Sequence, residues 1–348
     1  MKRPNLNDEM AAFLKQFEPY SRDYFERKIR QSRRVSPLIS RFYRELSDFS
    51  SGGKRMRAFL VYLGYVVGGK NGVLRILPIS LAIEIVHSFL LIHDDIIDKS
   101  ETRRGKATIH KIFEKEFGSY YGISQAIILG DIACFEALEL INNSDFKESE
   151  KVACVKQVLL VLRETGYGEA LDVESTYRLG SGSLRLTRQV MDLKTARYSF
   201  VGPLTFGAIL GGAGSDRIRG LTKFGLASGM AFQLKDDILG VFGDEKITGK
   251  PTDIHEGKNT MLIYKTYELA SLKDRVILRK IWGNKSANSA DLNSVRKIVE
   301  NCGALGWCEK EQSRLIKKAK VNIKDITDDI GVQVLFGQIA DFVISRGK

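Results

Sequence analysis

Apolar residues recur every three or four positions along most of the chain, and the strict alternation typical of strands is scarce. The clearest case is the segment 216–242, where this period places the apolar side chains on one face of a helix. They are Phe224, Ala227, Met230, Ala231, Leu234, Ile238 and Val241. We therefore predict an all-α fold.

Turn residues divide the pattern into successive predicted helices. Residues 1–50 are expected to form two polar, amphipathic helices that break near Ser36 and Pro37. A Gly-Gly turn within 51–57 opens a helix to about Val67, and the next helix starts near Leu74 and runs through residues 91–98. Further predicted helices cover residues 108–118, 123–142, 148–179, 184–212 and 216–242, followed by a loop at 243–259 and a helical C-terminal segment.

Composition supports a buried core in one domain. Only six of the 348 residues are proline, and 43% are apolar. The most hydrophobic stretch, 73–97, includes Arg75, Glu84 and His87. Charged groups are costly inside a bilayer, so we predict a buried helix here and not a membrane span.

The net charge of +12 bears on the ligand more than on the fold. Basic residues are spread along the chain among 42 acidic ones, and no basic module interleaved with aromatic residues indicates nucleic-acid binding. Such charge suits a phosphorylated ligand equally well. The four cysteines lack metal-binding spacing, and the first ten residues lack the apolar core of a signal peptide. We expect reduced thiols in a cytoplasmic protein.

Two clusters of aspartates end apolar helices. In LIHDDIID (91–98), Asp94, Asp95 and Asp98 lie near one helical face, where like charges destabilise the helix unless cations neutralise them. QLKDDILG (233–240) repeats the arrangement with Asp236 and Asp237. Carboxylates together with substrate phosphates are what Mg²⁺ prefers as ligands. The clusters therefore indicate a metal-dependent site, and the alternative is two solvated acidic helix ends.

Basic residues lie on either side of both clusters and together suit a diphosphate. They are Lys54 and Arg57 behind the Gly-Gly turn, Arg103 and Arg104 beyond the first cluster, and Lys250 and Lys258 in the loop beyond the second. His87 precedes Asp94 by seven residues, so the two share a helical face. It is expected either to contact a ligand or to be an ordinary core histidine.

In this order, the segments resemble those of the trans-isoprenyl diphosphate synthases (polyprenyl synthetases), closest in pattern to the geranylgeranyl diphosphate synthases. The matching stretches are GGKRMR, EIVHSFLLIHDDIID, RRGKATIH, GD at 130–131, LKTARYSFVGPL, FQLKDDILGVFGD and GKP…DIHEGKNT. The resemblance implies an all-helical homodimer with a central cavity and three Mg²⁺ ions, which condenses isopentenyl diphosphate with an allylic diphosphate. It divides a single prenyl synthase domain into N-terminal helices (1–50), a catalytic core (51–262) and C-terminal helices (263–348).

The resemblance also assigns roles to matching positions. The implied Mg²⁺ ligands are Asp94, Asp98 and Asp236, with Asp95 and Asp237 in support. The implied isopentenyl diphosphate site consists of Lys54, Arg57, His87 and Arg104. The implied allylic diphosphate site consists of Arg103, Lys194, Lys250 and Lys258. Thr195 and Gln233 are implied to line the region of the allylic carbocation.

Three features depart from the family pattern. Gly240 stands where many members have a third aspartate of the second motif, and Asp244 is a common alternative. Glu169 replaces the glutamine of the family's G-Q-x-x-D, and the loop before Lys258 is shorter than usual. Because Asp244 can replace the missing aspartate, we still expect activity. Glu169 adds a negative charge where the family has a neutral side chain, and the shorter loop could limit how far Lys258 extends.

Product length is predicted from the residues before the first Asp cluster. Phe89 lies five positions before Asp94, and the motif has no insertion, which resembles archaeal-type geranylgeranyl synthases. Leu90, in place of a second aromatic residue, disfavours the eukaryotic farnesyl pattern. We expect a C20 product, with farnesyl or longer products as alternatives and an ordinary core role for Phe89 as another.

Two other function classes would have different motifs. A class I terpene cyclase would replace the second Asp motif and would not need an isopentenyl diphosphate site. A non-catalytic synthase subunit would have lost one of the two Asp motifs, and this chain retains both.

Overall fold

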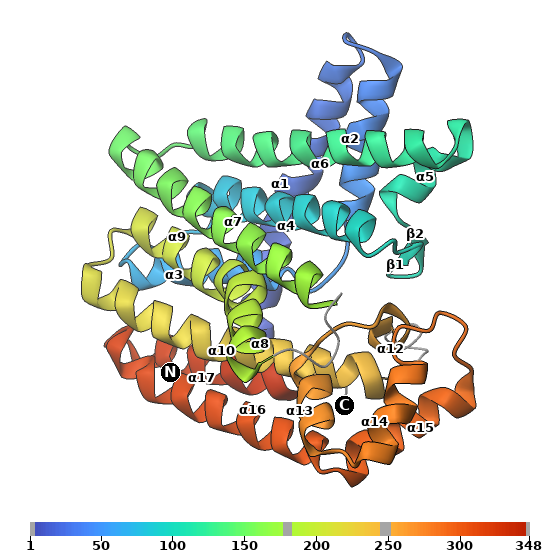
Figure 1. Ribbon diagram of the computed structural model, residues 1–348. Helices are drawn as coiled ribbons and strands as arrows, with labels where there is room; N and C mark the ends of the chain where they lie inside the picture. The colour runs from blue at the N-terminus through green and yellow to red at the C-terminus, as the bar shows by residue number, and fades with distance from the viewer. Residues whose placement is uncertain (1–3, 177–182, 244–251, 346–348) are drawn as a thin grey trace. The chain divides into compact units, whose positions relative to one another are not determined.

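A computed structural model describes residues 4–176, 183–243 and 252–345 (Figure 1). Within them the regular structure is helical apart from one two-stranded hairpin, which confirms the predicted all-α fold. Contacts group the chain into two compact units, residues 1–158 with 203–214, and residues 159–202 with 215–348. The single prenyl synthase domain stays a prediction.

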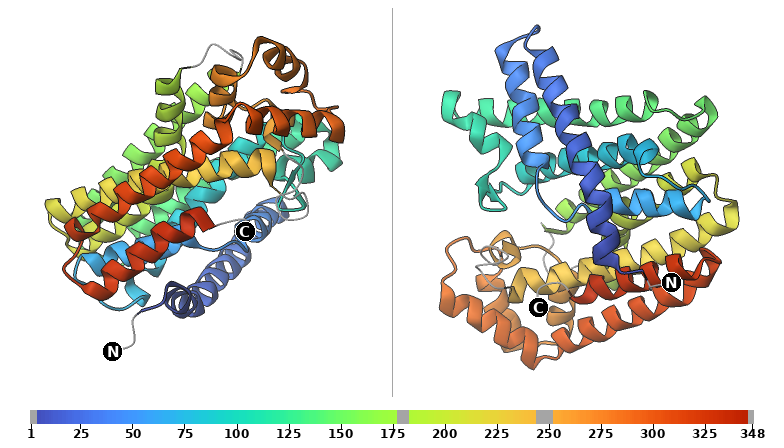
Figure 2. Two further views of the ribbon diagram at one scale, coloured as in Figure 1. Left: turned by 90° about the horizontal axis from the view of Figure 1, so that it is seen from below. Right: turned by 180° about the vertical axis from the view of Figure 1, so that it is seen from behind.

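The first unit is built around an apolar helix, α4 (Leu77–Ile97), which packs against α3 and α6. Its other elements are α1 (Leu6–Ser32), α2 (Pro37–Ser50), α3 (Met56–Val67), η1 (Leu74–Ile76), β1 (Thr102–Arg103), β2 (Lys106–Ala107), α5 (Ile109–Phe117), α6 (Ser119–Asn142), the first part of α7 (Glu148–Thr176) and most of α9 (Gly202–Gly211). Helices α1 and α2 pack side by side as a hairpin (Figure 2).

Local sequence explains where the first helices begin and end. The Ser36 side chain accepts a hydrogen bond from the Leu38 backbone N–H at 3.0 Å, and Pro37 occupies the first turn, where its missing N–H costs nothing. The predicted break near Ser36 and Pro37 is therefore confirmed. The predicted glycine turn is confirmed as well, because α3 begins at Met56 after Gly52 and Gly53, both with positive φ.

The second unit is organised by α10 (Ser215–Phe242), which packs against η2, α13, α16 and α17. Its other elements are the rest of α7, α8 (Leu184–Val190), the π-helical segment η2 (Met191–Val201), α12 (Thr252–Glu256), α13 (Met261–Leu269), α14 (Leu272–Ile281), α15 (Ser289–Asn301), α16 (Ala304–Val321), η3 (Asn322–Asp325) and α17 (Ile330–Ser345).

Three local features differ from the sequence prediction. The helix expected at 184–212 is divided into α8, the wider η2 and α9. The loop expected at 243–259 contains the short helix α12, and the loop after α4 forms the hairpin β1–β2. Strands of two residues are too short to give an alternating pattern, and no residue type marks where an α-helix changes to i→i+5 hydrogen bonding.

The segment Leu74–Ile97 is, by length and composition, apolar enough to cross a membrane. In this structure 67% of its most apolar window is buried inside the protein. The finding agrees with the predicted buried helix, because core helices of this kind pass the same test.

Candidate active site

The first Asp cluster lies at the C-terminal end of α4, where Arg103 pairs with two of its carboxylates. The Arg103 Nε donates to Asp95 Oδ1 at 2.8 Å and Oδ2 at 3.0 Å, and its Nη2 donates to Asp94 Oδ2 at 3.2 Å. The Asp95 side chain is only 1% exposed, whereas that of Asp94 is 19% exposed. Asp98 is the C-cap of the helix. Asp95 is therefore buried in its contact with Arg103, and the Asp94 carboxylate is more exposed to solvent than that of Asp95.

Burial raises the pKa of Asp95 to about 6, and the nearby charges of Asp94 and Asp98 add to this rise. Arg103 opposes it through its hydrogen bonds and its charge. The predicted crowding of like charges is therefore present, and one arginine partly compensates for it.

The hairpin β1–β2 directs the two adjacent arginines to different neighbours. Arg103 pairs with Lys106 across the strands, and Arg104 occupies the turn with a positive φ of 52°. While Arg103 reaches the aspartates, the Arg104 Nη1 donates to the Ser51 carbonyl at 3.5 Å, beside the turn that opens α3. A left-handed backbone conformation is strained for an arginine relative to a glycine. This conformation turns the chain at Arg104, so the Arg103 and Arg104 side chains contact different parts of the protein.

A second basic group surrounds His87. Burial lowers the pKa of His87 well below its usual value, and the charges of Arg57 and Arg104 lower it further. Burial also lowers the pKa of Arg104, with repulsion from Arg103 adding to the effect. The structure therefore places Arg57, His87 and Arg104 in one electrostatic environment, with an imidazole that stays neutral at physiological pH. Lys54, three residues before Arg57 in the sequence, is exposed to solvent.

Sequence reasoning missed the role of Arg55, which anchors the start of α3. Its side chain is 5% exposed and donates to Glu18 Oε1 at 2.8 Å and to the Ser50 carbonyl. It also lies 3.4 Å from Glu84, whose other oxygen accepts from the Ala58 backbone N–H at 3.0 Å. The available signal was Glu84 itself, because a lone acid inside an apolar helix needs a partner.

Phe89 and Leu90, the predicted chain-length residues, are both partly exposed on α4. The Phe89 ring packs edge-to-face on His93, with centroids 4.9 Å apart. His93 Nε2 lies 3.2 Å from the Ile127 carbonyl on α6, and a Cβ at Gly130 would come within 3.0 Å of the His93 ring. Gly130 therefore makes room for His93, which in turn supports Phe89.

In the second unit, a hydrogen-bonded chain runs from η2 to the start of α13. The Thr195 hydroxyl donates to Gln233 Oε1 at 2.6 Å, and the Gln233 amide donates to Asp237 Oδ1 at 2.8 Å. The other oxygen of Asp237 accepts from the Met261 backbone N–H at 3.1 Å. Three of the predicted site residues are thus joined, and Asp237 is buried, only 2% exposed.

The pKa of Asp237 is raised to about 8, mainly by burial. The hydrogen bond from Gln233 opposes this rise, and the nearby Asp253 and Asp236 charges reinforce it. A cation bound near this face would reverse the effect, because it favours the ionised form.

Lys194 is held by two carboxylates from α7. Its Nζ lies 2.7 Å from Asp172 Oδ2 and 2.9 Å from Glu169 Oε2. Close packing of α7 on η2 allows this, since a Cβ at Gly168 would lie 2.8 Å from the Lys194 Cα. Both Lys194 and Thr195 belong to the π-helical segment, and such segments are frequent at functional sites. Glu169, which departs from the family's G-Q-x-x-D pattern, therefore forms an ion pair with Lys194, a residue predicted to bind the diphosphate.

The segment after α10 contributes Lys258 and a further acid, Asp253. Lys258 Nζ lies 3.2 Å from Glu256 Oε2. Burial raises the pKa of Asp253 to about 7, Lys258 lowers it, and the charges of Glu256, Asp236 and Asp172 raise it further. Asp253 was missed, although it lies in the matching stretch DIHEGK. Lys250 and Asp244 lie outside the described residues.

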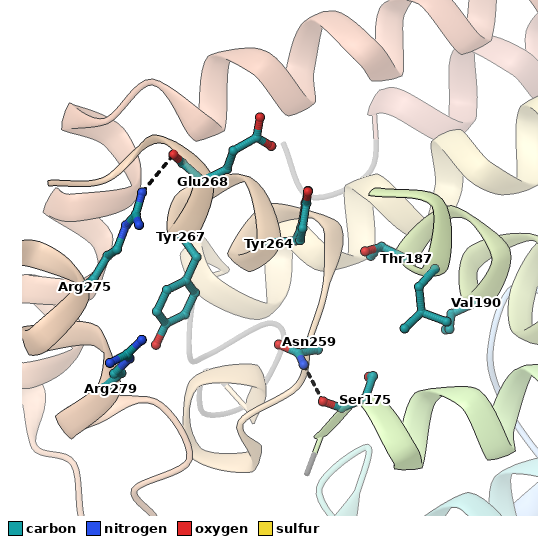
Figure 3. Close-up of a pocket in the computed structure, with 10 residues that line it drawn as sticks. Ser175, Thr187, Val190, Asn259, Tyr264, Tyr267, Glu268, Arg275 and Arg279 are labelled. Atoms are coloured by element: carbon teal, nitrogen blue, oxygen red, sulfur yellow. Dashed lines mark hydrogen bonds between the residues drawn. The ribbon is translucent and has the colours of Figure 1, made fainter. Parts of the chain in front are cut away.

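A pocket of about 350 Å³ lies in the same unit, among α7, α8, α13 and α14 (Figure 3). In Figure 3 the Asn259 amide points to the Ser175 carbonyl, and Arg275 reaches the Glu268 carbonyl at 3.1 Å. None of the residues that line it is a predicted site residue, although Asn259 directly follows Lys258. The pocket and the predicted diphosphate residues are therefore distinct.

The aspartates of the two Asp motifs could supply some, but not all, of the ligands of a Mg²⁺ ion. Among the described residues, no group of three or more His, Cys, Asp or Glu side chains is arranged to hold a metal alone. Mg²⁺ is usually bound through one or two carboxylates, waters and substrate phosphates, and each Asp motif offers such hard oxygen ligands. The donor set suits an ion that binds together with a diphosphate.

The chain is similar to a family of known proteins. A family model described as polyprenyl synthetase matches residues 38–299, a range that includes both Asp motifs. The geranylgeranyl diphosphate synthase of Sulfolobus acidocaldarius is 32% identical over 308 residues, which cover 86% of this chain and 89% of the relative. The geranylfarnesyl diphosphate synthase of Aeropyrum pernix is 30% identical, with 86% of this chain and 92% of the relative covered.

Solved structures agree with this placement. The crystal structure of geranylgeranyl pyrophosphate synthase from Corynebacterium glutamicum, complexed with isoprenyl diphosphate and magnesium, matches with a TM-score of 0.88. The match is 28% identical and covers 96% of this chain and 99% of that one.

Proposed function

The chain belongs to the polyprenyl synthetase family and is a prenyltransferase, and on that premise we propose that it makes geranylgeranyl diphosphate. The reaction joins isopentenyl diphosphate to an allylic diphosphate and releases pyrophosphate. The observation that carries the proposal is the family match over residues 38–299, which includes both Asp motifs and the Lys194–Thr195 segment.

Binding of isopentenyl diphosphate is assigned to Lys54, Arg57, His87 and Arg104. A neutral His87 can donate one N–H to a phosphate oxygen without a protonation step, and Arg57 and Arg104 supply fixed positive charge beside it. The turn conformation of Arg104 and the buried Arg55–Glu84 pair at the start of α3 position the neighbouring cations before substrate binds. Preorganised charge of this kind stabilises an anion more effectively than mobile charge.

The allylic diphosphate is assigned to Arg103, Lys194, Lys250 and Lys258. Arg103 and Lys194 are each paired with carboxylates in this structure, so the diphosphate must compete with Asp95 and with Glu169 and Asp172. Thr195 and Gln233 present oxygen dipoles that favour a developing allylic cation. No protein nucleophile takes part.

Asp94, Asp98 and Asp236 are proposed to hold Mg²⁺, three ions in all, with Asp95 and Asp237 in support. When bound, the metal neutralises the charge that develops on the departing pyrophosphate. The pairing of Asp95 with Arg103, and of Asp237 with Gln233 and Met261, orients the helix ends that carry the accessible aspartates.

A C20 product is proposed because Phe89 is supported by His93, which gives the growing chain a fixed aromatic stop. The similarity to a geranylfarnesyl synthase keeps a C25 product as the main alternative. We further propose a homodimer located in the cytoplasm. A terpene cyclase or a non-catalytic subunit is disfavoured, because both Asp motifs lie within the family match.

Pyrophosphate release tests the proposal. The purified chain is incubated with Mg²⁺, isopentenyl diphosphate and, separately, C5, C10 and C15 allylic primers. Release is expected with at least one primer and is expected to fall by about 10²-fold or more in Asp94→Ala and Asp236→Ala. Release that persists in both variants would refute the assigned metal ligands, and release that never occurs would refute the function.

A further inference from the structure

The pocket among α7, α8, α13 and α14 has a lining of two different chemical kinds (Figure 3). Arg275 and Arg279, one helical turn apart on α14, line it together with Tyr267. Helix α8 contributes Leu186 and Val190, and in Figure 3 Val190 lies across the pocket from the two arginines. Its volume of about 350 Å³ is at the lower end of the range for small-molecule sites, about 300–1,000 Å³. The pocket therefore suits a small ligand with one charged end and one apolar end.

The Tyr267 hydroxyl is the clearest sign that this pocket is built for a ligand. The residue is only 9% exposed, and its buried hydroxyl has no hydrogen-bond partner among the residues that the structure describes. Buried tyrosine hydroxyls usually have one, because burial without a partner is costly. In Figure 3 the hydroxyl points toward Arg279, whose charge opposes the rise in the pKa of Tyr267 that burial causes. The hydroxyl can therefore donate to an anion that Arg279 attracts.

Arg275 is oriented by groups that leave its charge uncompensated. Its Nε donates to the Ala270 carbonyl at 3.1 Å, and its Nη2 donates to the Glu268 carbonyl at 3.1 Å. Glu268 is the one acid among the described lining residues, and its carboxylate accepts from Lys265 Nζ at 2.9 Å. Figure 3 shows this carboxylate pointing away from Tyr267 and Arg279. The α14 end of the pocket is therefore positively charged and partly preorganised.

We propose that this pocket is a second ligand site, which binds a small phosphorylated alcohol with its phosphate at the α14 end and its short apolar chain at the α8 end. The site is separate from the residues assigned to the reaction, since none of them lines the pocket. The inference rests on the proposed function only for the source of such an ester, because the substrates of that reaction are phosphorylated alcohols.

Both ends of the pocket contribute to this choice of ligand. The planar guanidinium of arginine matches the oxygens of a phosphate, and a tyrosine hydroxyl adds one more donor. Leu186 and Val190 are both partly exposed, so an apolar chain placed against them removes their surface from water. An inorganic anion would leave the α8 end unused, and a neutral alcohol would leave the arginines and the Tyr267 hydroxyl without an acceptor of matching charge.

Binding is measured by isothermal titration calorimetry in excess chelator, with geranyl monophosphate as the probe and inorganic phosphate and geraniol as its two halves. Geranyl monophosphate should bind at least about tenfold more tightly than inorganic phosphate, because burial of only two methylene groups supplies that factor. Geraniol should not bind detectably. Arg279→Gln and Tyr267→Phe should each weaken binding of geranyl monophosphate by about tenfold, the effect of one lost hydrogen bond to a charged group. Val190→Thr should weaken geranyl monophosphate binding and leave that of inorganic phosphate unchanged.

Matched controls separate this site from the rest of the chain. Lys280→Gln removes an exposed cation next to Arg279 on the same helix, and Tyr120→Phe removes the hydroxyl of a residue that is 86% exposed. Both should bind as wild type, and so should Arg103→Gln, which removes a cation assigned to the allylic diphosphate. Tyr267→Phe should not lower the thermal unfolding midpoint without ligand, because its hydroxyl has no partner to lose among the described residues. That result separates lost binding from misfolding.

Wild-type affinity in both Arg279→Gln and Tyr267→Phe would overturn the inference, as would a wild-type protein that binds no geranyl monophosphate. Affinity lost in Arg103→Gln and kept in Arg279→Gln would also overturn it, because the ligand would then occupy the predicted allylic site. Failure of the proposed function is a different result: the binding pattern would hold as expected while the wild-type chain releases no pyrophosphate from any primer.

Discussion

Glu169 contacts Lys194, and the resemblance to the family's G-Q-x-x-D implies a glutamine at this position, so Glu169→Gln is an informative change. Lys194 Nζ lies between Glu169 and Asp172, at 2.9 Å and 2.7 Å. A bound allylic diphosphate must draw this cation away from two carboxylates. The substitution keeps the shape and a hydrogen-bond acceptor but removes one competing charge, so we expect tighter binding of the allylic substrate.

The size of the effect follows from exposure. A hydrogen bond to a charged group contributes about 1.5–3 kcal/mol when well buried, whereas an exposed ion pair contributes less than about 1 kcal/mol. The side chains of Lys194 and Glu169 are 20% and 21% exposed, so solvent screens the pair in part. We take about 1 kcal/mol, which corresponds to a roughly fivefold lower KM for the allylic diphosphate.

The assay measures KM for each substrate from initial rates of pyrophosphate release. KM for isopentenyl diphosphate should not change, because its assigned residues belong to other elements. Glu174→Gln, on the exposed side of the same helix, is the matched control and should leave both constants unchanged. A higher allylic KM in Glu169→Gln would refute the reasoning, because it would show that Glu169 positions Lys194 for substrate and does not compete with it.

Three further predictions concern the first unit. Arg55→Ala leaves the buried Glu84 without its cation and should lower the free energy of unfolding by about 3–5 kcal/mol in urea titrations. Arg27→Ala removes an exposed ion pair and should change the free energy of unfolding by less than about 0.5 kcal/mol. Equal effects of the two substitutions would contradict the structural role of Arg55. Because the pKa of His87 is lowered in the folded state, the unfolded chain binds a proton that the folded chain does not below about pH 6.5. Stability should therefore fall as pH decreases from there, by up to about 1.4 kcal/mol per pH unit, and His87→Gln should flatten this slope in the same titrations. Phe89→Ala removes the aromatic ring that His93 supports and should lengthen the product seen by chromatography; an unchanged product length would show that Phe89 is an ordinary core residue.

Much of the fold follows from side-chain periodicity, because burial of one helical face is a local pattern. The long apolar segment before Asp94 and the repeat at 216–242 both correspond to core helices, α4 and α10. The π-helical segment that contains Lys194 could not be predicted, because no residue type marks the change from i→i+4 to i→i+5 backbone hydrogen bonds. The hairpin that separates Arg103 from Arg104 was missed for the same lack of signal.

The candidate site shows a sharper limit. Residue types and spacing indicated the aspartates and most of the cations, but they did not show that Arg55, among the basic residues of GGKRMR, turns into the core. That outcome depends on Glu18 and Glu84, which come from distant helices, and on a positive φ at Arg55. Asp253 was likewise invisible, because its contact with Gly240 joins two positions that no helical period relates.

The central claim is that this chain elongates an allylic diphosphate to C20 in a Mg²⁺-dependent reaction. The most direct measurement is the chain length of the product made by the purified protein from isopentenyl diphosphate and a C15 primer, with and without a metal chelator. We predict geranylgeranyl diphosphate together with equimolar pyrophosphate, and neither product in the presence of chelator. No elongation of the C15 primer, or elongation that continues unchanged without metal, would contradict the account.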